Sequence, residues 1–258
     1  MTPRQKIKRI TTWIRQYAKQ NRVPTLVVGI SGGIDSSVVS TLCALSGLPT
    51  IAVAMPIHQS KHTHSLSLAH GAWLQSRFER VSMDVVDLTP VFDQFRGLLL
   101  ERNAPGEQQE LAFANSRSRL RMMTLYQIAQ THSGIVVGTG NRVEDFGVGF
   151  FTKYGDGGVD ISPIGDCMKT EVWDMGRELD LLPEIIAAPP TDGLWTDGRT
   201  DEDQLGMTYP ALEQAMLLDE SGKPPATRQQ RQDLGRYRKI RERNLHKMLP
   251  IPVCQFGK

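Results

Sequence analysis

Short apolar runs alternate with longer amphipathic stretches through residues 1–140 of the chain. Each apolar run has the length of a buried strand, and each amphipathic stretch repeats its apolar positions at helical spacing. The pattern predicts strands at 24–30, 51–56, 81–88 and 134–139, and helices at about 3–20, 35–46, 62–78, 89–101 and 110–131. Strands separated by helices indicate an α/β fold, in which a doubly wound parallel sheet carries helices on both faces.

The second half of the chain is less regular. Residues 150–160 are rich in glycine and show no helical period, and helices are predicted at about 169–180, 208–219 and 226–246. The polar stretch 188–206 predicts a long loop, and structureless loops of this length are usually functional or disordered. Leu194 and Trp195 within it favour a loop that becomes ordered over a ligand, with disorder as the alternative.

Length and charge narrow the class of protein. The 258 residues suffice for one large α/β domain, and no clear linker divides them, so we expect a single domain over residues 1–258. The 30 Lys and Arg nearly balance the 28 Asp and Glu, which argues against nucleic acid as a partner. No apolar run approaches the ~18 residues of a membrane span, so we expect no membrane partner either.

Two features bear on the compartment. The basic, amphipathic residues 1–20 fit either a transit peptide or a first domain helix, and Thr2 before Pro3 favours the helix because it forms a typical helix start. Cys43, Cys167 and Cys254 are scattered and odd in number. Unpaired cysteines fit a reducing cytoplasm better than secretion.

The stretch VVGISGGIDSS at residues 27–37 carries the strongest chemical signal. An apolar run, two glycines and then a helix start let the backbone approach a ligand closely and offer unpaired N–H groups to an anion such as phosphate. Asp35 would repel phosphate oxygens unless a hard cation such as Mg²⁺ lies between them. The alternative is an ordinary glycine turn in which Asp35 or Ser36 caps a helix. In a parallel sheet ligands lie at the carboxyl ends of the strands, where Thr139-Gly140-Asn141 is also expected.

Five motifs together resemble one family. SGGIDSS resembles the SGGxDS loop of the PP-loop (N-type) ATP pyrophosphatases. GTGNRVED at 138–145, FFTKYGDGGVDISPIGD at 150–166, NSRSRLRM at 115–122 and PPTDGLWTDGRTDEDQLG at 189–206 are similar to signatures of the NAD synthetases. The resemblance covers roughly residues 25–250, and it is specific because SGGIDS alone does not separate these enzymes from GMP synthetase or tRNA-modifying relatives.

The resemblance implies a Rossmann-like fold and an ammonia-dependent NAD synthetase. Such an enzyme uses ATP to adenylate the nicotinate carboxylate of deamido-NAD and releases pyrophosphate. Ammonia then displaces AMP and gives NAD. The resemblance also implies a homodimer, and the chain has no room for a glutaminase domain.

The family pattern assigns roles residue by residue. It implies ATP contacts from the phosphate loop, from two threonines and from a lysine near the phosphates: Gly29, Ile30, Ser31, Gly32, Gly33, Ile34, Asp35, Ser36, Thr139, Thr191 and Lys169. Asp35 and Lys169 are the implied catalytic residues, and Asp35 and Glu144 the implied Mg²⁺ ligands. Because the segment after Glu144 is one residue longer than the common family spacing, Asp145 is a rival ligand. Glu144 or Asp145 starting a helix, and Lys169 as an ordinary first-turn lysine, remain alternatives.

The family pattern implies deamido-NAD contacts from Arg119, Lys153, Asp160, His246 and Lys247. Arg117, Arg119 and Arg121 lie two residues apart on one predicted helix, so they cannot all face the same way. We therefore expect two of the three arginines to be solvated or paired. For His246-Lys247 a plain basic helix end is the alternative, and for Lys153 a tight turn.

The sequence gives only weak support for a zinc site or for a catalytic triad. His58, His62, His64 and His70 invite a zinc site, but no cysteine or carboxylate pattern joins them, and a solvated helix face is the expected alternative. No nucleophilic triad is visible. Asp160 or Asp166 is a candidate acceptor for the ammonium proton.

Two rival functions remain open. One is a PP-loop ligase that acts on another nucleotide or on a tRNA base, although a tRNA enzyme would normally add a basic domain or cysteines for sulfur transfer. The other is a non-catalytic sensor of adenine nucleotides, which would not need Lys153, Asp160 or the 189–206 stretch.

Overall fold

The sheet of this protein is parallel, as its sequence predicts. The computed structural model describes residues 1–100, 106–191, 193 and 199–256. Its four strands run in the order β3-β2-β1-β4, with β1 at Leu26–Gly29, β2 at Thr50–Ala54, β3 at Val81–Val85 and β4 at Ile135–Val136. All three strand pairs are parallel. The reversal of strand order beside β1 creates the switch point at which such sheets bind ligands.

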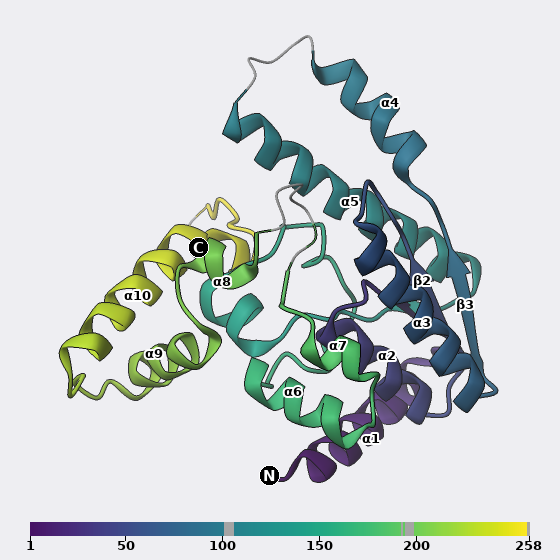
Figure 1. The fold of residues 1–258 in the computed structure, drawn as a ribbon, viewed down its shortest axis with the longest axis horizontal. Coiled ribbons are helices and arrows are strands. Elements are labelled where there is room, and N and C mark those ends of the chain that lie inside the picture. The colour runs from purple at the N-terminus through teal and green to yellow at the C-terminus, as the bar shows by residue number, and fades with distance from the viewer. Residues whose placement is uncertain (101–105, 192, 194–198, 257–258) are drawn as a thin grey trace.

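Helices cover both faces of the sheet (Figure 1). They are α1 Pro3–Asn21, α2 Ile34–Leu45, α3 Lys61–Arg77, α4 Thr89–Leu100, α5 Glu107–Thr131, the π-helix η1 Arg142–Val148, α6 Lys169–Glu178, α7 Pro183–Ala187, α8 Asp201–Leu205, α9 Tyr209–Ser221 and α10 Arg228–Met248. Alternate residues of β1 enter different cores. Leu26 and Val28 pack with residues of α1, α2 and α6, whereas Val27 packs with residues of α4 and α5. The period of two along a strand thus builds a doubly wound, two-sided fold.

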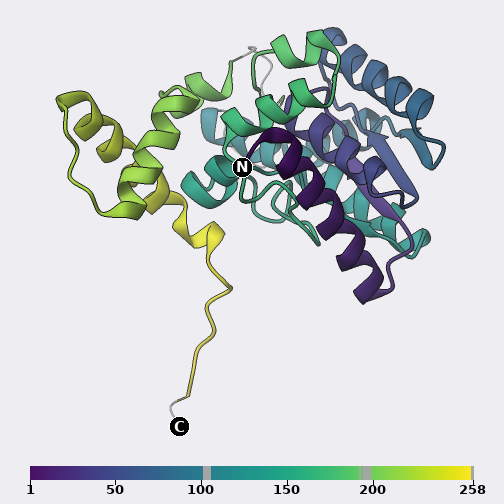
Figure 2. The same cartoon turned by 90° about the horizontal axis from the view of Figure 1, so that it is seen from below.

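The C-terminal helices form a unit beside the sheet. α9 and α10 pack against each other and against η1, around a separate apolar cluster that includes Tyr209 and Tyr237. Beyond α10 the chain leaves the body as an extended tail (Figure 2). This arrangement places the start of α9 and the end of α10 near the switch point, where both contribute side chains.

The first 21 residues belong to the folded core. Thr2 and Gln5 form a capping box at the start of α1, and the side chains of Ile14 and Ala18 are buried. The prediction of a first domain helix is therefore confirmed. No helix among the described residues is long and apolar enough to cross a membrane.

The prediction for residues 188–206 is partly wrong. Residues 201–205 form α8, because Thr200 and Asp203 make a capping box at its start and Gly206 ends it with a left-handed φ of 64°. These local capping signals outweigh the polar composition of the segment. The predicted ordering of Leu194 and Trp195 lies outside the described residues.

His70 lies inside the fold and not on the solvated face expected for the four histidines. Its ring is 0% exposed, stacks on Trp73 and shares a 2.8 Å hydrogen bond between its Nε2 and Ser40 Oγ of α2. Burial lowers the pKa of His70 from 6.5 to about 4. The folded protein therefore holds this imidazole neutral at a pH where the unfolded chain would protonate it.

We expect His70 to weaken the fold in acid. The contribution of the neutral His70 to the free energy of unfolding is complete above pH 6.5 and is lost as the pH falls toward 4. In that range the unfolded chain binds a proton at this residue and the folded chain does not. The lost stability approaches about 3 kcal/mol. Urea unfolding of His70→Gln between pH 7 and pH 4 is expected to show a shallower acid decline than the parent. His62→Gln, at an exposed position, is expected to leave the decline unchanged, and an equal decline in all three proteins would contradict the prediction.

Candidate active site

The glycine loop between β1 and α2 has the geometry of a phosphate cradle. Gly32 has a φ of +87°, and a Cβ at this position would lie 2.7 Å from the carbonyl oxygen of Thr63. The hydroxyls of Ser36 and Ser37 donate to the carbonyl of Gly33 at 3.0 and 2.9 Å, which holds the loop in shape. Only glycine combines this backbone conformation with so close an approach to a neighbouring helix.

The helix that follows the loop is not capped in the ordinary way. Gly33 is the N-cap of α2, and no side chain accepts a hydrogen bond from its first turn. Asp35 and Ser36 lie inside the helix, so the alternative in which one of them merely caps it is wrong. The free end of α2 presents the unpaired amides and positive dipole end that favour an anion.

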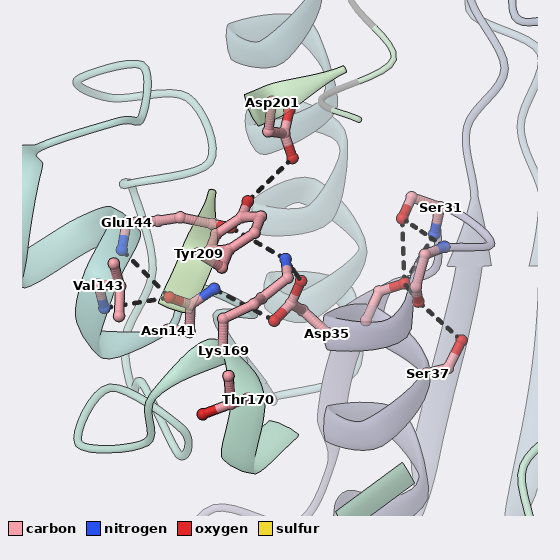
Figure 3. A network of polar contacts seen from close by, with 12 residues as sticks. Ser31, Asp35, Ser37, Asn141, Val143, Glu144, Lys169, Thr170, Asp201 and Tyr209 are labelled. Atoms are coloured by element: carbon pink, nitrogen blue, oxygen red, sulfur yellow. Dashed lines mark hydrogen bonds and ion pairs between the residues drawn. The ribbon is translucent and has the colours of Figure 1, made fainter. Parts of the chain in front are cut away.

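Asp35 turns away from the loop toward a buried lysine (Figure 3). Lys169 is 2% exposed, and its Nζ donates to Asp35 Oδ2 at 2.5 Å and to Glu144 Oε1 at 2.9 Å. Asn141 donates to Asp35 Oδ1 at 3.2 Å, and its own side-chain oxygen caps η1. Three predicted site residues from α2, η1 and α6 thus meet in one ionic cluster, and Lys169 is not an ordinary solvated first-turn lysine.

The charges of this cluster depend on one another. Burial alone would lower the pKa of Lys169, but the two carboxylates outweigh it and raise that pKa above its ordinary value. Burial raises the pKa of Asp35, and Lys169 only partly offsets the effect. Burial acts on Glu144 in the same direction, yet Lys169 and the Tyr209 hydroxyl leave its pKa lowered. The ammonium therefore stays charged and faces an excess of negative charge.

The two carboxylates fit a magnesium ion bound mainly through a nucleotide. Asp35 and Glu144 approach one cation from two sides, since the Lys169 ammonium already occupies a position between them. Within the described residues no group of three or more His, Cys, Asp or Glu could hold a metal by itself. Mg²⁺ commonly takes one or two carboxylates and completes its shell with phosphate oxygens and water. The same finding gives the four histidines no support as a zinc site.

Asp145 lies beside this cluster but is not bonded into it as Glu144 is. Its carboxylate lies against Gly140, where a Cβ would be 1.7 Å from Oδ2. Burial raises the pKa of Asp145 well above its ordinary value, and the carboxylates of Asp156 and Glu144 raise it further. The contact with Lys169 therefore favours Glu144 over Asp145 as the partner of Asp35. Glu144 and Asp145 both lie in the first turn of η1, as the alternative of residues that start a helix predicts.

A cavity of about 330 Å³ lies near the cluster, since Lys247 in its lining interacts electrostatically with Asp145. It lies between α5, residues 151–154 and the end of α10, and is lined by Asn115, Arg119, Phe151, Thr152, Lys153, Tyr154, His246 and Lys247. Four of the five residues predicted to contact deamido-NAD are thus brought together. Their basic side chains make the cavity suitable for a phosphate or carboxylate group.

The walls of this cavity are joined by hydrogen bonds from lysine side chains to backbone carbonyls. Lys153 Nζ donates to the carbonyl of His246 at 3.1 Å, and Lys247 Nζ donates to that of Phe151 at 2.7 Å. Tyr154 has a φ of +61°, a strained value for a residue with a side chain. Such strain is common where a loop is shaped for a ligand.

Two predicted residues, Asp160 and Asp166, do not lie where their predicted roles would place them. Asp160, the fifth predicted contact, lies outside the cavity lining, and its carboxylate accepts hydrogen bonds from the Val136 amide at 2.8 Å and the Tyr126 hydroxyl at 3.1 Å. Asp166, the other candidate proton acceptor, is 98% exposed and lies 3.4 Å from Arg142. Neither placement favours a role in proton transfer.

The arginines of α5 divide as predicted. Arg119 lines the cavity, Arg121 Nε donates to the Met55 carbonyl at 3.0 Å, and Arg117 is buried over the ring of Phe92. The expectation that they do not share one face is confirmed.

The other residues predicted to contact ATP lie at the ends of β1 and β4 and in the segment that follows α7. Gly29 ends β1, Ile30 follows it, and Thr139 lies just after β4, which pairs directly with β1. Thr191 is exposed, and its hydroxyl donates to the Arg199 carbonyl at 3.3 Å.

Several residues of the site were not found from the sequence. Asn141 and Asp201 lie inside the quoted motifs but were given no role, and Tyr209 was not singled out, although all three join the ionic cluster. The signal for Asn141 was available, because Asn is a strong N-cap residue. Nothing in the pattern around Tyr209 separates it from a core tyrosine.

Comparison with known proteins agrees with the fold and the site. The sequence profile of the NAD synthase family matches residues 6–249. The chain is 36% identical to the NH(3)-dependent NAD(+) synthetase of Carboxydothermus hydrogenoformans over 84% of its length and 86% of that protein. It is 34% identical to the protein of the same name from Archaeoglobus fulgidus, over 96% of both chains. The structure of NMN synthetase from Francisella tularensis matches with a TM-score of 0.86 and 29% identity, covering 99% of this chain and 100% of that one.

The parallel sheet, the glycine loop and the helix start after it define a Rossmann-like nucleotide-binding protein. Within this class, the chain belongs to the NAD synthase family.

We expect Lys169→Met to destabilise the protein by about 3–5 kcal/mol at neutral pH, because it leaves two largely buried carboxylates without their counter-charge. The loss should shrink as the pH falls, since protonation of either carboxylate relieves the repulsion. Urea unfolding at pH 5 and pH 8 measures both effects. Lys239→Met, at an exposed position of α10, is the matched control, and a variant as stable as that control would contradict the prediction.

We expect Asp160→Ala to affect stability and not substrate binding. It leaves the amide of the buried Val136 without its acceptor, at a cost of about 1–3 kcal/mol. Thermal unfolding and KM for the pyridine nucleotide are measured together, with Asp166→Ala as the exposed control. A raised KM with an unchanged melting temperature would instead support the contact implied by the family pattern.

Proposed function

We propose that this protein amidates deamido-NAD with ammonia in an ATP-dependent reaction, the last step of NAD synthesis. The observation that carries the proposal is the juxtaposition of a phosphate cradle with its Asp35–Lys169–Glu144 cluster and a basic cavity of about 330 Å³. Membership of the NAD synthase family and relatives named NH(3)-dependent NAD(+) synthetase support it. The protein would be a ligase that forms a carbon–nitrogen bond.

The reaction divides into two displacements. A nicotinate carboxylate oxygen attacks the α-phosphorus of ATP, and the bond to the β-phosphate oxygen breaks, which releases pyrophosphate. Ammonia then attacks the carbonyl carbon of the mixed anhydride, AMP leaves with its oxygen, and the nitrogen loses a proton. The first step needs an electrostatic partner for pyrophosphate, and the second needs a site closed to water so that ammonia competes.

The phosphate loop and Lys169 serve the first displacement. Residues Gly29 to Ser36 would hold the triphosphate through loop amides and hydroxyls, with Thr139 and Thr191 as further contacts. Lys169 is charged and fixed, so it offers a preorganised cation to the leaving pyrophosphate. Asp35 and Glu144 would hold Mg²⁺, which neutralises phosphate charge when bound.

The basic cavity serves the pyridine nucleotide. Arg119, Lys153, His246 and Lys247 would bind its phosphate groups and leave the nicotinate end directed toward the phosphate loop. A guanidinium fork and two ammonium groups suit a pyrophosphate, because they match its spread negative charge. Asp160 remains a predicted contact of this substrate on the family pattern alone.

We also propose that the active form is a homodimer of single-domain subunits in the cytoplasm. α4 exposes Val91, Phe95 and Leu98, at 52%, 42% and 72%, which is an apolar surface typical of an interface. Cys43 and Cys167 are buried and all three cysteines are free, which fits a reducing compartment. Size-exclusion chromatography with light scattering tests the dimer.

A second candidate substrate is nicotinate mononucleotide. The NMN synthetase of Francisella tularensis matches this chain over nearly its whole length with a TM-score of 0.86. Deamido-NAD and the mononucleotide share the nicotinate, the ribose and the adjoining phosphate, so the cavity residues would suit either.

The decisive experiment supplies ATP and Mg²⁺ with each pyridine nucleotide and either ammonium or glutamine. We expect NAD and AMP from deamido-NAD with ammonium, and a lower kcat/KM with the mononucleotide. A reversed preference would assign the second candidate. Product with glutamine would contradict the ammonia-dependent assignment, and ATP binding with no amide from either substrate would favour a sensor or a different PP-loop ligase.

Asp35→Asn provides the matching test of the site. It keeps the side-chain shape but removes the charge that faces Lys169 and the proposed cation, so we expect at least about a 100-fold loss of kcat/KM. Asp174→Asn, an exposed aspartate of α6 that pairs with Arg177, is the control. Full Mg²⁺-dependent turnover by Asp35→Asn would contradict the proposed site.

A further inference from the structure

Tyr209 is a buried polar residue to which neither the sequence nor the proposed reaction assigns a task. It is the first residue of α9, directly after the N-cap Thr208, and it is 0% exposed. Its ring belongs to the apolar cluster of the C-terminal helices and meets the ring of Trp173 edge-on at 5.7 Å. The ring alone accounts for packing, and phenylalanine would serve that purpose equally well.

The hydroxyl of Tyr209 points out of this apolar cluster into the ionic one (Figure 3). It donates to Glu144 Oε1, the same oxygen that accepts from Lys169, and Asp201 Oδ2 of α8 lies 3.2 Å from it. The phenol has a single hydrogen, so two carboxylates converge on one donor. The Lys169 ammonium also lies 4.8 Å from the centre of the tyrosine ring.

The backbone around Tyr209 is fixed as firmly as its side chain. Its amide donates to Glu202 Oε1 at 2.9 Å, and the amide of Asp201 donates to the Pro190 carbonyl at 3.0 Å. The start of α9 is thereby tied to α8, and α8 to the segment that leads from α7. Tyr209 is the point at which these elements contact Glu144.

Tyr237 shows what an ordinary core tyrosine looks like in the same cluster. It is 1% exposed and belongs to the same apolar cluster as Tyr209. Its hydroxyl donates to the backbone carbonyl of Gly147 at 3.4 Å and also interacts with the Arg241 guanidinium, and neither of these partners is a carboxylate. The difference between the two residues lies in the partner of the hydroxyl and not in burial.

We propose that Tyr209 is a positioning residue, whose hydroxyl fixes the Glu144 carboxylate in the orientation that serves Lys169 and the nucleotide-bound cation. It acts through Glu144 and touches neither substrate in this role. The inference rests on the proposed function for the identity of the cation and nucleotide. Partners that orient a metal-binding carboxylate typically change metal affinity by 10–100-fold when they are removed.

The test measures cation-dependent nucleotide binding and not turnover. The full-length protein is titrated with α,β-methylene-ATP, which cannot release pyrophosphate, at a series of Mg²⁺ concentrations in a calorimeter. For Tyr209→Phe we expect the Mg²⁺ concentration at half-maximal binding to rise about 10–100-fold, with binding restored at saturating Mg²⁺. Tyr237→Phe is the matched control, and we expect it to leave the Mg²⁺ dependence unchanged.

A purely structural role for Tyr209 gives a different result. It would lower the melting temperature and the amount of competent protein without moving the Mg²⁺ midpoint, and that outcome overturns the proposal. An equal Mg²⁺ midpoint in Tyr209→Phe and the parent overturns it as well.

A second variant keeps the test valid if Tyr209→Phe does not fold. Asp201→Asn leaves the tyrosine ring and its packing in place but alters the group on the far side of the phenol. We expect its Mg²⁺ midpoint to fall, because the phenol hydrogen then goes to Glu144 without a competing carboxylate. We expect the double variant to match Tyr209→Phe alone, because both changes act through one hydroxyl. If Tyr209→Phe does not fold, an unchanged Mg²⁺ midpoint in Asp201→Asn overturns the proposal.

The outcome is separable from that of the proposed function. If the parent protein forms no amide from either pyridine nucleotide, while Tyr209→Phe still shifts the Mg²⁺ midpoint of analogue binding, the reaction is wrongly assigned and the positioning role stands. If amide forms normally and the midpoint does not move, the reaction stands and the positioning role fails.

Discussion

The structure depends on one buried cation. Lys169 reaches from α6 into a space between Asp35 of α2 and Glu144 of η1, segments that lie 134 and 25 positions away from it in the sequence. Burying an ammonium is costly unless its charge is compensated, so the three segments must keep their relative positions for the fold to remain stable. The same requirement holds the phosphate loop, which precedes Asp35, against the strand end that precedes Glu144. The contacts that stabilise the fold around Lys169 therefore also fix the arrangement of the site.

The parallel sheet makes that arrangement possible. β1 and β4 are adjacent and parallel, so the segments that follow them emerge side by side at one edge. α2 leaves the first strand and η1 follows the second, and α6 packs against α2 on the same face. Tyr209 then joins the cluster from the C-terminal helices, which have their own apolar core. Each element is stabilised by apolar packing elsewhere, and only polar tips meet at the centre.

The sequence predicted the features that depend on local patterns, and it did not predict those that depend on contacts between distant segments. The four strands follow from short apolar runs and most of the longer helices from helical periodicity, because both patterns record burial along the chain. The short helices η1 and α7 were not predicted. The family motifs named Asp35, Glu144 and Lys169, but no pattern shows that the lysine lies between the two carboxylates. His70 was expected on a solvated helix face and Tyr209 was not singled out, since their partners Ser40 and Glu144 are 30 and 65 positions distant. Asp160 shows the converse: a motif residue whose oxygens support a strand.

In the proposed function, the two halves of the site divide the recognition of the two nucleotides. The phosphate cradle is built from backbone geometry, so a loop of this kind binds a triphosphate whatever the second substrate is. The cavity is lined by the side chains of Arg119, Lys153, His246 and Lys247, which in the proposed function would recognise the negative charge of the pyridine nucleotide. A mononucleotide and a dinucleotide share the part that carries the reacting carboxylate and its nearest phosphate. The motifs around this cavity are therefore compatible with both substrates, and the choice between them must arise from surfaces that meet only the adenosine half of the dinucleotide.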